Sequence, residues 1–302
     1  MKDIIYVENH YFVTVKDDSF KFKNVIDKVE KYFLIGEVEA IIFDHPNSYF
    51  SNKLVISCVE NHIPLIFCDK QHSPISEISS NFRATNRLER INLQLQLLSK
   101  TKDRMWKKII SKKIYNQAKC LENNLIYSNK VRELTEISKE VTAGDRNNRE
   151  ALAARIYFSS LYGSKFKRGR YSDVTNAGLN YGYAIIRTFI KNELTYYGFE
   201  MSMGIKHKSL ENPFNLSDDI IEVYRPFVDN IVYDLVFNEK IESFEFESKK
   251  KLINVLYVNC LVDKKIVRLL DAIKMTVQSL IKCYRTNSPT SLLLPQMIGV
   301  DS

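Results

Sequence analysis

The sequence of 302 residues has few cysteines, little glycine and no long apolar run. Its five cysteines are scattered and form no Cys-x-x-Cys pair, which excludes a zinc ribbon and argues against a disulfide framework. No stretch approaches the roughly 18 to 20 apolar residues of a membrane helix, and residues 1–12 have no apolar segment behind a basic start. We therefore expect a cytoplasmic protein with reduced thiols and no membrane partner.

Sequence motifs of several common enzyme classes are also missing. The chain has no G-x-S-x-G nucleophile elbow, no G-x-x-x-x-G-K phosphate loop and no G-x-G-x-x-G fingerprint. Cys58 and Cys68 lie in apolar runs, where a thiol usually packs rather than reacts. The chemistry of this chain must therefore be sought in other residue types.

Basic residues exceed acidic ones. The chain has 44 Lys and Arg against 36 Asp and Glu, a net charge of +8. An excess of this size permits a polyanionic partner, although many globular proteins reach it without one. The hydrophobic fraction of 45% fits a globular protein with a real core and excludes a disordered chain.

Strand patterns fill the first part of the chain. Asp17-Asp18 separates two short segments, 11–16 and 19–23, as in a β-hairpin. Short apolar runs at 38–43 and 64–68 are typical of buried strands, and residues 51–59 carry a helical stripe. This part predicts a small sheet domain with one helix.

Helical patterns fill the rest. Apolar residues recur at helical spacing in two early segments, at Leu88, Ile91, Leu95 and Leu98, and at Trp106, Ile109, Ile110 and Ile114. Gly163 and Gly198 end two further helices, and Asp263 is predicted to cap a last one. We expect an α+β protein with a small N-terminal β domain at 1–74, a linker at 75–85 and a larger all-α domain at 86–302.

Two clusters of cations could meet a polyanion. The helix predicted at 102–117 carries Lys102, Arg104, Lys107, Lys108, Lys112 and Lys113. A loop beside Gly169 carries Lys165, Lys167, Arg168 and Arg170. Such a loop can lie on phosphates and release their counterions. The alternative is an ordinary solvated face, which is what most charge runs are.

Three side chains could bind a metal, but their spacing alone has no diagnostic value. Glu150 opens a helix whose next turn is small and apolar, yet Asn147 stands three residues before it, as in a capping box. Asp219 and Glu222 have the same ambiguity, because Asp219 could cap and Glu222 could occupy the third helical position. His207 lies between two lysines, where a surface histidine is the usual outcome.

Four blocks occur in a fixed order. They are 144–158 (GDRNNREALAARIYF), 176–183 (NAGLNYGY), 204–207 (GIKH) and 215–229 (NLSDDIIEVYRPFVD). Together they closely resemble the CRISPR-associated integrase, the metal-dependent endonuclease that inserts new spacers into CRISPR arrays of prokaryotes.

The N-terminal half is more loosely similar to the type II (type II-A-like) branch of this family. The residues concerned are Ile66-Phe67-Cys68-Asp69 with His72-x-Pro74, and Trp106 with Lys113-Ile114-x-x-Gln117. Many relatives in this branch have paired histidines where this chain has Lys206-His207, and Pro-Phe where it has Val223-Tyr224.

The resemblance implies a catalytic set and a cofactor. Glu150, His207 and Glu222 are the implied catalytic residues and the ligands of one divalent cation, Mg²⁺ or Mn²⁺, with Asp219 behind them. Two carboxylates and an imidazole suit these ions better than a thiolate site would. The 3′-hydroxyl of a DNA end would attack a phosphodiester, and water would take its place in a hydrolytic side reaction.

The resemblance also implies partners. They are double-stranded DNA (protospacer and CRISPR repeat), a second copy of the chain, a small CRISPR-associated protein that completes a hetero-hexamer, and other proteins of type II systems. The expected DNA contacts are Arg146, Arg149, Lys165, Lys167, Arg168 and Arg170. We further expect residues 4–7 and 11–23 to need a partner surface, because their apolar faces are small.

Two other functions are compatible with the residues alone. One is a DNA-binding scaffold whose carboxylates only cap helices, and the other is an RNA-binding helical protein. Metal-dependent turnover separates the enzyme from both.

Overall fold

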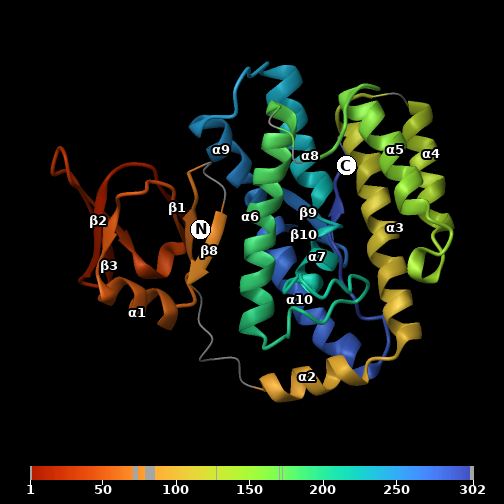
Figure 1. Cartoon of the computed structure of the whole chain (residues 1–302), viewed down its shortest axis with the longest axis horizontal. Helices are drawn as coiled ribbons and strands as arrows, with labels where there is room; N and C mark the ends of the chain where they lie inside the picture. Colours follow the sequence, from red (N-terminus) through yellow and green to blue (C-terminus); the bar gives the residue numbers. More distant parts are fainter. Residues whose placement is uncertain are drawn as a thin grey trace. The chain divides into compact units, whose positions relative to one another are not determined.

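The computed structural model describes residues 2–70, 74–78, 86–126, 128–169, 171 and 173–299. The chain divides into two compact units, Met1–Thr85 and Asn86–Ser302 (Figure 1). Strands dominate the first unit and helices the second, so the predicted α+β class is confirmed. Within the described residues, no helix is long and apolar enough to cross a membrane.

Two four-stranded sheets form the first unit. One sheet has the order β1 (Asp3–Val7), β5 (Val38–Phe43), β7 (Leu65–Cys68) and β8 (Pro74–Ile78). The other has the order β4 (Glu30–Leu34), β3 (Ser19–Asn24), β2 (Tyr11–Lys16) and β6 (Tyr49–Phe50). Helix α1 (Asn52–Glu60) and the 3₁₀ turn η1 (Ile35–Glu37) complete the unit.

Local sequence signals explain much of this unit. Asp17 and Asp18 take left-handed backbone angles, with φ of 46° and 54°, and Lys16 pairs with Ser19. This is the two-residue turn whose twist matches a β-hairpin, so the predicted hairpin is confirmed. Ser51 caps α1 by accepting a hydrogen bond from the backbone N–H of Leu54.

One apolar core joins both sheets and α1. Its buried members include Val13 and Phe20 from one sheet, Ile41 and Leu65 from the other, and Leu54 from the helix. The small apolar faces of residues 4–7 and 11–23 are therefore covered within the unit itself. The size of these faces no longer argues for a second copy.

The expected linker at 75–85 begins inside a strand. Strand β8 (Pro74–Ile78) pairs with β7, although its sequence lacks the alternation of a half-buried strand. Residues 79–85 lie outside the described part of the chain.

Helices build most of the second unit. They are α2 (Arg87–Gln96), α3 (Ser99–Asn123), α4 (Ser128–Glu140), α5 (Arg149–Tyr162), α6 (Val174–Tyr196), α7 (Asn215–Ile221), α8 (Arg225–Tyr233), α9 (Phe246–Ile253) and α10 (Leu269–Thr286). Shorter helical turns are η2 (Ala143–Asp145), η3 (Asp234–Asn238) and η4 (Asn254–Tyr257). Helices α3, α4 and α5 pack side by side (Figure 1).

The prediction of an all-α domain at 86–302 is wrong. The second unit also contains a small antiparallel sheet. Strands β9 (Asn259–Val262), β10 (Lys265–Arg268) and β11 (Gln296–Met297) form it in the order β10-β9-β11. Asp263 does not cap α10; Asp263 and Lys264, with φ of 47° and 66°, form the tight turn between β9 and β10. This turn chemistry outweighed the helical spacing of the apolar residues that follow.

Helix α2 forms as predicted but buries a different face. Leu88 and Leu95 are 73% and 66% exposed, whereas Arg90 and Gln94 are buried. The Gln94 amide donates to the backbone carbonyl of Glu200 and accepts from its N–H, both at 2.9 Å. A paired polar contact therefore orients this helix.

Helices α6 and α8 approach closely at two glycines. A Cβ added at Gly182 would overlap Val228 Cγ1, and one at Gly178 would lie 3.2 Å from Val232 Cγ2. The absence of a side chain at Gly182 is thus a packing requirement.

We predict that Gly182→Ala lowers the free energy of unfolding by about 1–3 kcal/mol, because the added methyl overpacks the contact with Val228. The matched variant Gly178→Ala should be close to neutral, since its milder contact is offset by the roughly 0.5–1 kcal/mol that alanine gains in a helix. Urea unfolding of both variants measures the difference. Equal stability of the two would contradict the packing argument.

Candidate active site

A buried lysine joins two carboxylates that are far apart in the sequence. Lys113, on α3, places its Nζ 2.6 Å from Glu150 Oε1 and 2.6 Å from Glu222 Oε2. Glu150 lies in the first turn of α5, and Glu222 directly follows α7. The Lys113 side chain is only 11% exposed, so three elements converge on one buried cation.

The capping alternative for Glu150 is wrong. Asn147 turns away from Glu150: its side chain accepts from Thr142 and donates to the carbonyl of Glu140. Asp145 caps α5 instead, accepting from the backbone N–H groups of Arg149 and Glu150. The Glu150 carboxylate is therefore not used as a cap.

Asp219 is also no helix cap. It lies within α7, its side chain is fully buried, and it accepts hydrogen bonds from the backbone N–H groups of Ile205, Lys206 and His207. A fourth bond, of 2.7 Å, joins its Oδ1 to His207 Nδ1. One carboxylate thus shapes a whole loop and orients the imidazole.

The same loop depends on a glycine and on the lysine beside the histidine. A Cβ at Gly204 would overlap the carbonyl oxygen of His207 and lie 2.8 Å from Asp219 Oδ2. Lys206 donates from Nζ to the carbonyl of Gly144 at 2.9 Å. Lys206, which stands where many relatives have a histidine, therefore ties the histidine loop to the turn before Glu150.

Charge pairing shifts the pKa values in the site. Burial alone would raise the pKa of Glu222, but the Lys113 ammonium and the Arg225 guanidinium hold it at about 2. Arg225 Nε lies 2.9 Å from Glu222 Oε1. The hydrogen bond to Asp219 raises the pKa of His207 above its ordinary value. Both effects keep opposite charges facing each other.

The donor set fits a divalent cation. The two glutamates already share one cation, the ammonium of Lys113, so their oxygens converge on a point that a cation can occupy. His207 uses Nδ1 for Asp219, which leaves Nε2 as the remaining ring nitrogen. Carboxylate oxygens with one imidazole suit Mn²⁺ or Mg²⁺.

A ready-made cluster of three ligands is not formed. Among the described residues, no three His, Cys, Asp or Glu side chains are grouped tightly enough to hold a metal. The Lys113 ammonium stands between the two glutamates. For a metal to bind between the two glutamates, the Lys113 ammonium would have to move away from them.

Two predicted DNA contacts, Arg146 and Arg149, shortly precede Glu150 in the sequence. Arg146 is exposed and lies 3.3 Å from Asp103 Oδ2, while Arg149 pairs with Glu140 at 3.0 Å. The Arg146 side chain is 79% exposed, so its pair lies at the surface, where such interactions are weak, whereas the Arg149 side chain is 33% exposed.

The cationic loop is more divided than its sequence suggests. Lys165 and Lys167 are exposed. Arg168 points inward and donates to the carbonyl of Gly169 and to the side chains of Asn176 and Asn180. Arg170 lies outside the described residues. Of the described members of this loop, the two exposed lysines are therefore the better candidates for contacts with DNA.

The basic helix predicted at 102–117 forms part of α3, but it is no simple solvated face. Lys108 Nζ donates to the backbone carbonyls of Pro289, Thr290 and Leu292. Lys112 donates to Gln296 at 2.8 Å. These two lysines hold the C-terminal segment of the chain against α3.

Three residues of the site went unrecognised in the sequence. Lys113 was named only in a basic run and in the N-terminal similarity, and Arg225 and Asp229 only as parts of a family block. Asp229 is buried, accepts from the hydroxyls of Tyr157 and Tyr183, and burial raises its pKa to about 6. Spacing gives no hint of contacts between helices so far apart in the chain.

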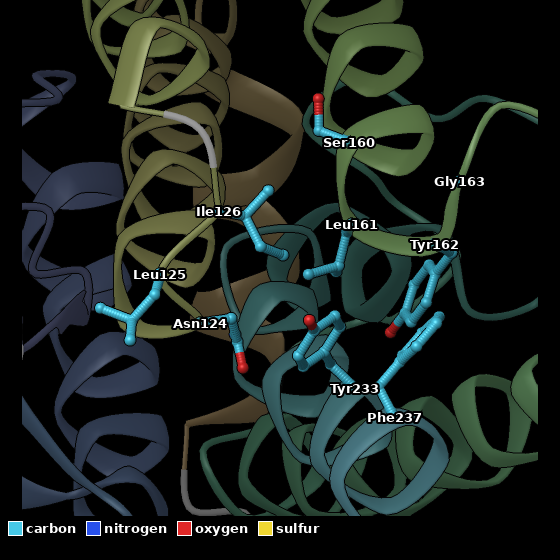
Figure 2. Close-up of a pocket in the computed structure, with 9 residues that line it drawn as sticks. All are labelled: Asn124, Leu125, Ile126, Ser160, Leu161, Tyr162, Gly163, Tyr233 and Phe237. Carbon is cyan, nitrogen blue, oxygen red and sulfur yellow. The ribbon is translucent and has the colours of Figure 1, made fainter. Parts of the chain in front are cut away.

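Three cavities lie among the described residues of this unit. The first, of about 750 Å³, borders His207 and is lined also by Lys102, Lys208 and Leu210. The second, of about 450 Å³, is lined by Lys107, Lys108 and Leu292. The third, of about 420 Å³, lies between the ends of α3, α5 and α8 and the turn η3 (Figure 2). In it Tyr162, Tyr233 and Phe237 gather on one side, while Leu125 points away (Figure 2). Only the first cavity adjoins the proposed ligands.

This chain is similar to known proteins over most of its length. The family model described as CRISPR associated protein Cas1 matches residues 4–271. The chain is 31% identical to the CRISPR-associated endonuclease Cas1 of Neisseria meningitidis serogroup C (strain 8013), over 87% of this chain and 86% of that protein.

Solved structures share the fold. A casposase bound to its integration product has a TM-score of 0.76 at 16% identity and covers 95% of this chain and 92% of its own. A chain of a Cas6-RT-Cas1–Cas2 complex has a TM-score of 0.72 at 18% identity, covering 99% of this chain and 36% of its own. With the family model and the Neisseria relative, the conclusion is direct: the chain belongs to the CRISPR-associated protein Cas1 family.

Proposed function

We propose that this protein is a metal-dependent DNA endonuclease and integrase that inserts protospacer DNA into a CRISPR array. The observation that carries the proposal is the convergence of Glu150 and Glu222 on one buried cation, with His207 oriented beside them by Asp219. Relatives named CRISPR-associated endonuclease Cas1 support the nuclease, and the casposase neighbour supports integration.

The reaction is a phosphoryl transfer without a covalent enzyme intermediate. The 3′-hydroxyl of a DNA end attacks a phosphodiester, one P–O bond forms, and the bond to the opposite oxygen breaks. A bound Mg²⁺ or Mn²⁺ would polarise a non-bridging phosphate oxygen and stabilise the charge that develops at phosphorus. Water in place of the hydroxyl gives hydrolysis, which makes the protein a hydrolase as well.

The chain's own residues supply the frame for this step. Glu150 and Glu222 offer the cation oxygen ligands from two different helical segments, and His207 offers a nitrogen. Asp219 binds both the backbone N–H and Nδ1 of His207 and so fixes the orientation of the imidazole, which leaves Nε2 as the nitrogen for a cation. Arg225 keeps Glu222 ionised and so able to bind a cation.

The proposed partners are double-stranded DNA and a small protein of the Cas2 type. A solved neighbour belongs to a Cas1–Cas2 complex and another is bound to its integration product, which supports both. The hetero-hexamer and contacts with other type II CRISPR proteins extend this proposal. The similarity to the Neisseria relative along most of the chain accords with the type II branch.

A homodimer is the further part of the assembly. Several large apolar side chains of the first unit are well exposed, including Tyr32 and Leu34 on the edge strand β4, Phe12 and Tyr49 on its sheet, and Ile75 on β8. Exposed apolar residues on an open sheet edge favour pairing with another chain. Two active sites related by a two-fold axis suit a reaction that joins both ends of one duplex.

The first prediction of this function concerns the ligands. Glu150→Ala and His207→Ala should each reduce strand transfer by roughly 10²–10³-fold, because a group that organises the transition-state charge is lost. For Glu222 we choose Gln, since alanine would remove the carboxylate that pairs with Arg225 and one of the two that pair with the buried Lys113. Chelation by EDTA should abolish the activity, and Mn²⁺ should restore it.

The measurement is strand transfer from a branched DNA that carries a free 3′-hydroxyl. The control is Glu136→Gln, whose carboxylate pairs with Lys139 at the surface of α4 and should not matter. Asp219→Ala is expected to lose the fold of loop 204–207 as well as activity, a stronger effect than a residue behind the ligands usually has. Robust activity of Glu150→Ala would refute the site.

The second prediction concerns the cationic loop. Replacing Lys165 and Lys167 together by alanine should weaken DNA binding across unrelated sequences and reduce the slope of log affinity against log salt by about 2. Arg168→Ala should instead lower thermal stability, because its guanidinium holds the loop together. Binding measured by fluorescence anisotropy at several salt concentrations decides this, and an unchanged slope would make the two lysines an ordinary surface.

The third prediction concerns assembly. Sedimentation at micromolar concentration should give about twice the chain mass of 35.3 kDa. Changing Tyr32 and Leu34 together to Asp should shift the protein towards monomer, because charges would replace exposed apolar groups on the edge strand. The matched variant Ile56→Asp, on helix α1, should stay dimeric. A wild-type mass near that of one chain would contradict the dimer.

A further inference from the structure

Lys113 has no task in the reaction as described, yet it occupies the centre of the site. Its ammonium donates to Glu150 Oε1 and to Glu222 Oε2, each at 2.6 Å, and the residue is 8% exposed. A lysine is almost never buried unless it is paired. Two short bonds to two carboxylates make this pairing specific.

The charges of this group already cancel without any metal. Glu150 and Glu222 carry one negative charge each, and Lys113 and Arg225 carry one positive charge each, with Arg225 held 2.9 Å from Glu222. A pair of glutamates left alone at this depth would repel each other and resist burial. The lysine therefore offsets this repulsion and holds both carboxylates in place.

A divalent cation held by Glu150 and Glu222 would compete with this ammonium. We propose that Lys113 is a positioning residue that holds the place of the divalent cation, so that the cation binds weakly to the free protein and tightly only together with DNA. This inference rests on the proposed function, and it concerns the order in which metal and DNA enter the site.

The coupling to DNA follows from the charge balance. A divalent cation added to a neutral group leaves two positive charges in a poorly solvated place, which is unfavourable. A phosphodiester beside it brings negative charge and removes much of that cost. Because linkage is reciprocal, the metal then strengthens DNA binding by the same factor as DNA strengthens metal binding.

The chain offers a matched control next to Lys113. Lys112 lies on the same helix, is partly buried and donates to Gln296 at 2.8 Å, with its ammonium 5.2 Å from the ring of Tyr115. It contacts neither Glu150 nor Glu222 among the described interactions. Loss of its charge should therefore change stability without changing the affinity for a metal.

The experiment is a Mn²⁺ titration of metal-free, full-length protein, in which the signal of free Mn²⁺ is followed by electron paramagnetic resonance. Each protein is titrated alone and with a duplex that ends in a 3′-dideoxynucleotide, so that no reaction occurs. Lys113→Met should bind Mn²⁺ at least about tenfold more tightly than wild type in the absence of DNA. The effect of DNA on Mn²⁺ affinity should shrink in the same variant, whereas Lys112→Met should behave as wild type.

Thermal unfolding gives a second readout. In EDTA, Lys113→Met should melt below wild type, and Mn²⁺ should raise its melting temperature by more than it raises that of wild type. If Lys113→Met does not fold, Lys113→Gln keeps an amide donor without the charge and should show the same tightening. Mn²⁺ affinity equal to or weaker than that of wild type in the folded variants would overturn the role of Lys113. A wild-type protein that binds no Mn²⁺ even with DNA would instead overturn the proposed metal dependence.

Discussion

The pairing of buried charge is the constraint on which the catalytic unit depends. Burial of Lys113 is tolerated because Glu150 and Glu222 both accept hydrogen bonds from its ammonium. Burial of Glu222 is tolerated because Arg225 also donates a hydrogen bond to its other carboxylate oxygen. Helix α3 supplies the ammonium, α5 one carboxylate, the end of α7 the other carboxylate, and the first residue of α8 the guanidinium. The requirement to satisfy four charges thus fixes the relative positions of elements that the chain connects only through long segments.

A second group, the Asp219 carboxylate, organises the site through hydrogen bonds with backbone N–H groups. Asp219 satisfies three consecutive N–H groups, and Gly204 gives the returning backbone the room to approach it. The result is a rigid loop built around a single carboxylate, with the imidazole of His207 hydrogen-bonded to the same atom that receives its N–H. Lys206 extends this order to the turn before Glu150, so the segments that carry the proposed ligands are joined directly.

Local chemistry determined what the sequence could reveal before the structure. The Asp17-Asp18 turn, the apolar strand at 38–43 and the glycine that ends α5 were predictable because each depends on neighbours in sequence. The predicted helix cap at Asp263 was wrong, because this residue forms a tight turn. The predicted buried face of α2 was wrong, because a long-range contact of Gln94 outweighed helical periodicity. Block order predicted Glu150, His207 and Glu222 as ligands, whereas the contacts of Lys113 reach residues 37 and 109 positions away and leave no local pattern.

The net charge of +8 overstates the positive surface available to DNA. Lys108 and Lys112 donate hydrogen bonds to backbone and amide groups of the C-terminal segment. Lys113 donates to two glutamates, and Arg168 donates to groups of its own loop and of α6. These cations would make only a weak contribution to counterion release, because they have partners inside the fold. Exposed side chains such as Lys165 and Lys167 remain the better candidates for contacts with DNA. Clustering of basic residues in this chain therefore does not by itself indicate phosphate contacts, because several of the clustered cations bind groups inside the fold.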